Sequence, residues 1–269
     1  MKQFTLPDND QIRGFVRERY GAIAEQDDKT CGCTATGCCG GAADSLSYAG
    51  KLGYTAEQIA SVPAGADLGL GCGNPLAIAS IQAGETVLDL GSGAGFDCLL
   101  AARQLAGTGR IIGVDMTPAM ITKARANAAK SGFGNVEFRL GEIEALPVAD
   151  AAVDLILSNC VINLSPEKDR VFREAYRVLK PGGRLAIADV VATKPLPAAL
   201  KAKLEAIGAC VGGATEIETL RTLLLQAGFD RIDIVAKESS RAYIREWTDD
   251  PSAGEFVVSA LITAYKPVT

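Results

Sequence analysis

Cysteine is the residue type that stands out in this chain, which has eight cysteines and no histidine. Without histidine there is no Ser-His or Cys-His nucleophile pair, no imidazole base and no histidine-ligated metal site. Cys72, Cys160 and Cys210 lie in distant segments, each beside glycine or at the predicted end of an element. Thiolates are nucleophiles and ligands for soft ions. We therefore expect sulfur to take part in the chemistry, with a buried core thiol as the alternative for Cys160.

A glycine loop is the second group of residues that could do chemistry. It runs from Asp89 to Gly95 as DLGSGAG, directly after a predicted strand and at the start of a predicted helix. Glycine lets the backbone approach a ligand closely, and a helix N-terminus offers free N–H groups. Asp115 ends the next predicted strand, 22 residues beyond Gly93, where an acidic side chain can bind both ribose hydroxyls of a nucleotide-like ligand.

Two such ligands compete for this loop. A dinucleotide fingerprint has a third glycine at position 96, where this chain has Phe96. An acid two residues before the first glycine, as Asp89 is to Gly91, resembles instead the first motif of class I methyltransferases that use S-adenosylmethionine. The acidic turn LGEI at 140–143 and the later VLKPGGRL resemble the same class. The alternative is a tight strand-helix turn that binds no ligand.

The elements that must position these residues follow an alternating pattern. Strand-like apolar runs at 87–90, 110–116, 136–140, 153–160 and 183–191 alternate with amphipathic stretches at 96–106, 118–131 and 166–179. This alternation indicates a parallel sheet covered on both faces by helices, and ligands of such sheets bind beyond the carboxyl ends of the strands. We predict an α/β fold with a doubly wound, mostly parallel, Rossmann-like methyltransferase sheet, a helical cap and a small C-terminal α+β segment.

The flanking regions carry further predicted elements. We expect helices at 9–25 (with Asp10 as N-cap), 56–60, 197–210 and 216–227, and strands at 231–236, 241–246 and 255–265. The expected division is an N-terminal helix, a cysteine-rich mobile loop and part of the cap at 1–74, the S-adenosylmethionine-binding α/β domain at 75–195, and the rest of the cap with the C-terminal region at 196–269.

Composition and charge limit the classes of partner. Lys+Arg 27 against Asp+Glu 32 gives a net charge of −5, with no polybasic run, which argues against nucleic-acid or anionic-membrane partners. The start of the chain does not resemble a signal peptide, and no apolar stretch approaches the length of a membrane span. We therefore expect a cytoplasmic protein with reduced thiols, and a monomer.

Several strings together resemble one methyltransferase family. SNCVINLSP, LGLGCGNP, VLDLGSGAGFD, IGVDM and ACVGGA are similar to segments of the arsenite S-adenosylmethionine methyltransferases, and the likeness covers about 67–215. The resemblance implies an α/β methyltransferase domain with an arsenite-binding cap. It implies a cofactor site at these residues: Asp89, Gly91, Ser92, Gly93, Asp115, Met116, Glu142, Ile143 and Asn159. It also implies arsenite and methylated arsenicals as substrates.

The resemblance gives the cysteines roles. Cys72, Cys160 and Cys210 are the implied ligands of trivalent arsenic, a soft and thiophilic element whose lone pair three thiolates leave exposed. Arsenic is itself the nucleophile, so the site orients it and needs no general base. Methyl transfer oxidises arsenic, and in the family an N-terminal cysteine forms a disulfide with a ligand cysteine. Thioredoxin or glutathione then restores the thiols.

The candidates for that N-terminal cysteine are Cys31, Cys33, Cys38 and Cys39, and we favour Cys38 or Cys39 because they lie nearest the domain. The same cluster could instead bind zinc or further arsenite. Cys98 is expected to pack in the core. The aromatic residue that some family members have two positions before the central cysteine is Leu70 here.

Other interpretations stay open at this point. One is a methyltransferase for a small carbon or oxygen nucleophile, with incidental cysteines, and another is a non-catalytic thiol protein that binds metalloids. Asp154 and Asp189 are expected to have structural roles. Tyr243, Trp247 and Phe256 are expected to pack against the C-terminal part of the sheet instead of forming a substrate cage.

Overall fold

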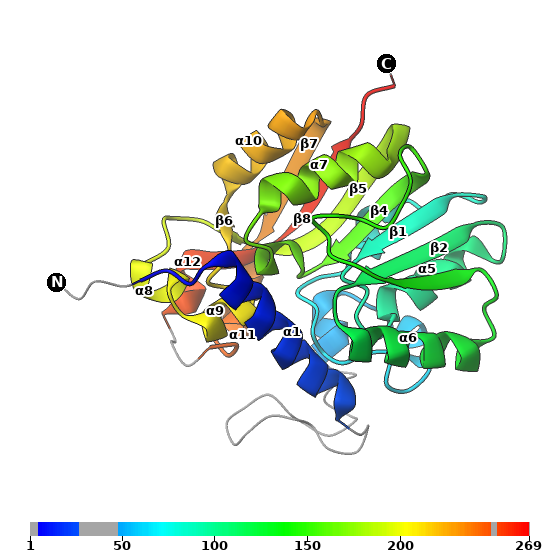
Figure 1. The fold of residues 1–269 in the computed structure, drawn as a ribbon, viewed down its shortest axis with the longest axis horizontal. Coiled ribbons are helices and arrows are strands. Elements are labelled where there is room, and N and C mark those ends of the chain that lie inside the picture. The colour runs from blue at the N-terminus through cyan, green and yellow to red at the C-terminus, as the bar shows by residue number, and fades with distance from the viewer. Residues whose placement is uncertain (1–4, 27–47, 249–251, 269) are drawn as a thin grey trace.

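The computed structural model describes residues 5–26, 48–248 and 252–268. Its strands are β1 (Thr86–Leu90), β2 (Arg110–Asp115), β3 (Val136–Leu140), β4 (Val153–Asn159), β5 (Leu179–Ala192), β6 (Thr215–Glu216), β7 (Asp230–Lys237) and β8 (Val257–Tyr265). They form one sheet in the order β3-β2-β1-β4-β5-β8-β7, with β6 beside β5 (Figure 1). β1 to β5 are parallel, and β8 runs antiparallel to β5 and β7. The predicted mostly parallel α/β sheet is confirmed.

Helices cover both faces of this sheet. They are α5 (Phe96–Leu105), α6 (Pro118–Ser131), α7 (Lys168–Val178) and α10 (Ile217–Ala227). Neighbouring strand residues point to opposite faces, so Val87 packs with α5 and α6 while Leu88 packs with α7 and α10. Because the central strands are buried on both faces, their sequences are apolar at nearly every position, and this is the pattern that made them predictable.

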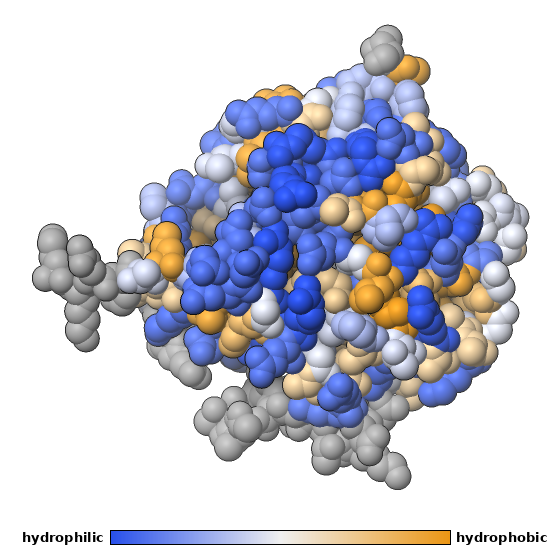
Figure 2. All heavy atoms as spheres, viewed as in Figure 1, coloured by the Kyte–Doolittle hydropathy of each residue, from blue (hydrophilic) through white to orange (hydrophobic). Residues whose placement is uncertain are grey.

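A cap lies over the carboxyl ends of β4 and β5. It consists of short helices and one longer helix: α1 (Asn9–Glu25), α8 (Ala198–Lys201), α9 (Leu204–Gly208), α11 (Arg241–Ile244) and α12 (Ala253–Phe256). Hydrophilic residues cover most of the face on which α1 and α7 lie, and a small hydrophobic group lies between α1 and α6 (Figure 2). Among the described helices, none is long and apolar enough to cross a membrane.

The N-terminal elements need one correction. α1 has the predicted length, but its N-cap is Asp8, not Asp10. The Asp8 carboxylate accepts the Gln11 backbone N–H, and the Gln11 side chain accepts the Asp8 N–H, which is a capping box. The short helix at 56–60 is present as α3 (Ala56–Ala60), and α4 (Leu76–Ala79) was not predicted.

Two predictions in the C-terminal region are wrong. The helix expected at 197–210 is broken into α8 and α9, because the backbone of Lys203 is extended. With this break, Leu200 of α8 and Ile207 of α9 are both buried in the cap. The strand expected at 241–246 is helix α11, preceded by the turn η2 (Glu238–Ser240), and Ile244 on it is fully buried. In both segments, packing against the cap outweighs local propensity.

The C-terminal aromatics contact both the cap and the sheet. Tyr243, Trp247 and Phe256 pack on the cluster that contains Cys72, Cys160 and Cys210. The strand predicted at 255–265 starts only at Val257, because α12 ends at Phe256. The cluster with the three cysteines also contains Val190 and Ala192 of β5 and Val257 of β8, so the expected packing against the sheet is present together with packing on the cap. The Tyr243 hydroxyl donates to the backbone carbonyl of Cys72 (3.3 Å), in the cap itself.

Candidate functional site

A cavity lies at the carboxyl edge of β1, β2 and β4, where the fold predicts a ligand site. Eight of the nine residues expected at the cofactor site line it: Asp89, Gly91, Ser92, Gly93, Asp115, Met116, Ile143 and Asn159. The ninth, Glu142, is not part of the lining; its half-exposed carboxylate pairs with Arg17 of α1 (3.1 Å), and Glu144 lines the cavity in its place.

The glycine loop is shaped by positive φ angles. Gly91 has φ +66°, and a Cβ there would overlap the Val161 side chain, so only glycine fits. Gly93 has φ +51° and nothing within 4 Å of its Cβ position. Its N–H donates to Asp115 Oδ2 (3.0 Å), while Oδ1 accepts the Thr117 N–H (2.8 Å). Asp115 therefore joins the glycine loop to the start of α6.

The lining has the chemistry of an S-adenosylmethionine site. Ser92 Oγ and Asp67 Oδ2 are buried without a hydrogen-bond partner among the described residues, and both residues line the cavity. Such orphaned polar atoms are expected where a polar ligand supplies the partner. The carboxyl groups in the lining are Asp67, Asp89, Asp97, Asp115 and Glu144. Five carboxyl groups suit a cofactor with a sulfonium and an ammonium group and would repel a pyrophosphate, so the residues present fit S-adenosylmethionine.

Arg13 of α1 is the one cation among the described lining residues, and two carboxylates of the α/β domain neutralise its charge. Its guanidinium binds Glu144 (3.4 Å) and Glu167. Asp67, Arg13 and Glu144 were not predicted from the sequence. Arg13 lies in the predicted helix at 9–25 and Glu144 directly follows the LGEI turn, but no motif marks any of the three as a cavity residue, and only folding brings them to the glycine loop.

A buried hydrogen-bond network lies beside the cavity. Tyr54 Oη donates to Asp97 Oδ1 (2.6 Å), and Asn159 Nδ2 approaches Asp97 Oδ2 (3.1 Å). Burial raises the pKa of Asp97 to about 6 and raises the pKa of Tyr54 well above its usual value. Cys98 is fully buried, as predicted, and its Sγ donates to Asp89 Oδ2 (3.2 Å).

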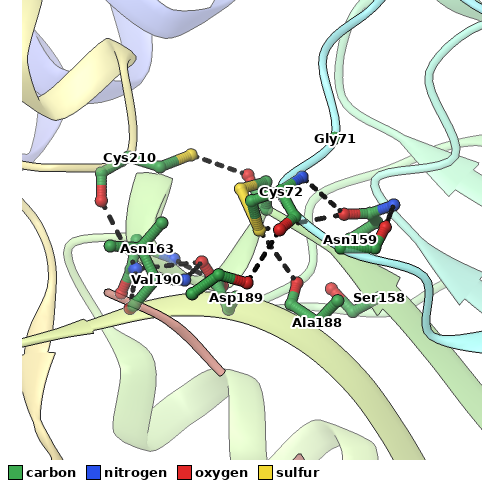
Figure 3. Close-up of a disulfide and its surroundings, with 12 residues drawn as sticks. Gly71, Cys72, Ser158, Asn159, Asn163, Ala188, Asp189, Val190 and Cys210 are labelled. Carbon is green, nitrogen blue, oxygen red and sulfur yellow. Dashed lines mark hydrogen bonds between the residues drawn. A yellow bond between two sulfur atoms is a disulfide. The ribbon is translucent and has the colours of Figure 1, made fainter. Parts of the chain in front are cut away.

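The three cysteines expected to bind arsenic meet in one buried cluster (Figure 3). Cys72 and Cys160 form a disulfide, with Cα atoms 5.7 Å apart. Their sulfurs and a carboxylate oxygen of Asp189 lie within 4.8 Å of one another. Cys210 is a free thiol whose Sγ donates to the Cys160 carbonyl (2.9 Å). Of the three, Cys160 lines the cavity, whereas Cys72 and Cys210 belong to the buried cluster around it.

Burial favours the neutral thiol of Cys210. Burial raises its pKa well above the usual value, and Asp189 raises it further, while Lys168 and Arg19 lower it. Burial also raises the pKa of Asp189, to about 6. Asp189 accepts backbone N–H groups of Ile162 and Val190, and this confirms the predicted structural role. Asp154, which accepts the Thr86 N–H and pairs with Lys180, is likewise structural.

The N-terminal cysteines Cys31, Cys33, Cys38 and Cys39 lie outside the described residues. The choice among them as redox partner, and their zinc-site alternative, therefore stay predictions.

Known proteins resemble the chain over this site and beyond it. A family model described as a methyltransferase domain matches residues 81–228. An arsenite methyltransferase of Halobacterium salinarum is 51% identical over 266 residues, which are 97% of this chain and 68% of that protein. An arsenite methyltransferase of Aquipseudomonas alcaligenes is 45% identical over 166 residues, 59% of this chain and 47% of that protein. The chain therefore spans about two thirds of one relative and less than half of the other.

A solved structure gives the same likeness. CrArsM, an arsenic (III) S-adenosylmethionine methyltransferase from Chlamydomonas reinhardtii, superposes with a TM-score of 0.61 at 33% identity. The match covers 82% of this chain and 73% of that one.

Proposed function

The chain belongs to the arsenite methyltransferase family, and on that premise we propose that it methylates trivalent arsenic, first arsenite and then methylarsenite, with S-adenosylmethionine. The observation that carries the proposal is the position of Cys72, Cys160 and Cys210: three distant segments contribute them to one buried cluster, and Cys160 of that cluster lines a cavity suited to that cofactor.

In this proposal the glycine loop and its surroundings hold the cofactor. Ser92 Oγ and Asp67 Oδ2 supply polar contacts that no described residue uses, and Asp115 holds the loop backbone in place. The surrounding carboxylates favour a cation in the cavity. S-adenosylmethionine supplies a methyl group on a positively charged sulfur, and the lone pair of trivalent arsenic is the nucleophile toward it.

The cysteines hold the arsenic. Each thiol replaces one hydroxide of arsenite, and the thiol proton leaves with that hydroxide as water, so the exchange needs no separate base. The Cys72–Cys160 disulfide must first be reduced to two thiols, which takes two electrons and two protons from an external thiol pair such as thioredoxin or glutathione. Three sulfurs around arsenic then leave its lone pair free.

Methylated arsenic must be returned to the trivalent state before a second transfer. We propose that protein thiols supply the two electrons by forming a disulfide, with Cys38 or Cys39 as one partner. The external reductant then regenerates the thiols.

The test is a product assay. Purified protein is incubated with arsenite, S-adenosylmethionine and a thiol reductant, and arsenic species are separated over time. Methylated arsenic should accumulate in the order monomethyl, then dimethyl. Absence of any methylated arsenic from a folded protein that binds the cofactor would refute the proposal and favour a thiol protein that only binds metalloids, or a methyltransferase for another substrate.

A further inference from the structure

The motif Ser158-Asn-Cys-Val-Ile-Asn163 places an asparagine on each side of Cys160. We propose that these two asparagines are positioning residues: Asn159 holds the Cys72 segment and Asn163 holds the Cys210 segment, so that all three sulfurs face one arsenic. The inference rests on the proposed function. It also gives Asn159 a role other than the cofactor contact expected from the sequence.

Asn159 makes two hydrogen bonds to the backbone of the Cys72 segment. Its Oδ1 accepts the Cys72 backbone N–H (3.0 Å), and its Nδ2 donates to the Gly73 carbonyl (2.9 Å). This pair of contacts fixes the backbone on both sides of the cysteine. The same Nδ2 also approaches Tyr54 Oη and Asp97 Oδ2 (both 3.1 Å), so the amide is itself held in orientation by buried groups.

Asn163 lies on the other side of the disulfide, together with Cys210 (Figure 3). Its Nδ2 donates to the Val190 carbonyl (2.5 Å) and to Asp189 Oδ1 (2.9 Å), and a longer contact reaches the Cys210 carbonyl (3.4 Å). Asn163 is 4% exposed, and these acceptors satisfy both hydrogens of its amide nitrogen without water. The amide nitrogen is therefore fixed on β5, with the Cys210 carbonyl as a third, more distant acceptor.

Glycines make room for both contacts. A Cβ on Gly71 would lie 2.9 Å from Asn159 Nδ2, and a Cβ on Gly213 would overlap the Asn163 carbonyl oxygen. The glycines beside Cys72 and after Cys210 therefore let each cysteine segment approach its own asparagine. The other glycine of each string, Gly73 or Gly212, is crowded by different groups: a Cβ would lie 2.9 Å from Ala188 Cβ or 2.8 Å from the Ile207 backbone N.

The backbone at two ligands is itself constrained. Cys160 and Cys210 have φ of +58° and +61°, a left-handed conformation that non-glycine residues adopt only where the surroundings hold them. Holding ligands before the ion arrives reduces the entropy cost of binding it. Removal of a group that orients a ligand typically lowers metal affinity by about 10- to 100-fold.

The test is a pair of double-mutant cycles on arsenite affinity, measured by equilibrium dialysis with the reduced full chain and no cofactor. Asn159→Ala should weaken arsenite binding by about tenfold in the wild-type and Cys210→Ser backgrounds, and have no effect in Cys72→Ser. Asn163→Ala should show the reverse: about tenfold in wild type and Cys72→Ser, none in Cys210→Ser. Asn159→Ala and Asn163→Ala serve as matched controls for each other. If either alanine variant does not fold, the corresponding serine variant is used.

The outcomes distinguish failure of the proposed function from failure of the positioning role of the two asparagines. If the wild-type chain does not bind arsenite, the proposed function fails. If it binds arsenite but each asparagine substitution has the same effect in every cysteine background, the side chains act on general stability and the inference is overturned. Thermal melting of every variant shows directly whether stability has changed.

Discussion

The Cys210 thiol is buried and neutral. It is 3% exposed, and burial together with Asp189 raises its pKa well above the usual value, so it is protonated at neutral pH. Its Sγ hydrogen is held by the Cys160 carbonyl. A neutral thiol suits exchange with neutral arsenite, because the proton leaves with the displaced hydroxide. It also resists oxidation, since the thiolate is the reactive form.

Sulfur ligation can be counted directly. We expect arsenic X-ray absorption of the reduced chain loaded with one equivalent of arsenite to show three sulfur neighbours. Cys210→Ser should show two sulfurs and one oxygen, because a serine hydroxyl does not replace a thiolate on a soft ion. Cys98→Ala is the control and should keep three sulfurs, since Cys98 contacts Asp89 and lies outside the cluster. Three sulfurs in Cys210→Ser would contradict the ligand assignment.

The unpartnered hydroxyl of Ser92 leads to a prediction about the affinity for S-adenosylmethionine. Because Ser92 Oγ has no partner among the described residues, Ser92→Ala removes no protein hydrogen bond. The variant should keep its melting temperature and bind S-adenosylmethionine about two- to tenfold more weakly by calorimetry. Unchanged cofactor affinity would remove Ser92 from the cofactor site.

At the scale of elements, α1 is the part of the cap that closes over the cofactor cavity. Arg13 on α1 is 16% exposed and binds Glu144, which is 6% exposed, and Glu167. One turn later Arg17 pairs with Glu142, and both of those side chains are far more exposed. The two ion pairs are similar in sequence spacing but differ in burial, so they should differ in energy.

A comparison of two substitutions tests that difference. Arg13→Met leaves the Glu144 carboxylate buried without its cation and should lower the free energy of unfolding by roughly 2 kcal/mol. Arg17→Met breaks an exposed pair and should cost less than about 0.5 kcal/mol. Denaturant unfolding measures both, and hydrogen exchange should show faster opening of α1 in Arg13→Met alone. Equal effects would mean that burial does not decide the strength of these contacts.

Elements differ in how far the sequence could predict them. β1, β2, β4 and β5 were predictable because burial on both faces makes them mostly apolar, whereas in the edge strand β3 apolar residues alternate with Glu137 and Arg139. The break at Lys203 and the helix α11 were not, because both depend on packing against the distant cap. The residues of the site likewise divide into those marked by local sequence and those that depend on distant packing. The glycine loop and the cysteines are marked by local strings, whereas Asp67 and the contacts of Asn159 depend on residues brought together by folding.

At the scale of the whole molecule, the cluster of Cys72, Cys160 and Cys210 joins three parts of the chain: the segment before β1, the end of β4 and the segment after α9. The Cys72–Cys160 disulfide covalently links the first two, across 88 positions of sequence. Oxidation state therefore controls whether two of the three proposed ligands are available.

Reduction should therefore switch arsenite binding on. Protein prepared without a reductant should bind less arsenite than one equivalent per chain, and treatment with a dithiol, followed by its removal, should restore one equivalent. The number of free thiols should rise by two when this disulfide opens, and peptide mapping of Cys72 and Cys160 assigns them. Tight arsenite binding with the Cys72–Cys160 disulfide intact would contradict the assignment of these ligands.

The most direct test of the central claim is a single-turnover reaction. Reduced chain, one equivalent of arsenite and methyl-labelled S-adenosylmethionine are mixed, quenched and separated, and the label is followed. The account predicts that the label appears on arsenic, approaching one methyl per chain, and that Cys160→Ser binds the cofactor but transfers none of it to arsenic. A folded, reduced wild-type chain that binds both compounds and leaves arsenic unlabelled would contradict it.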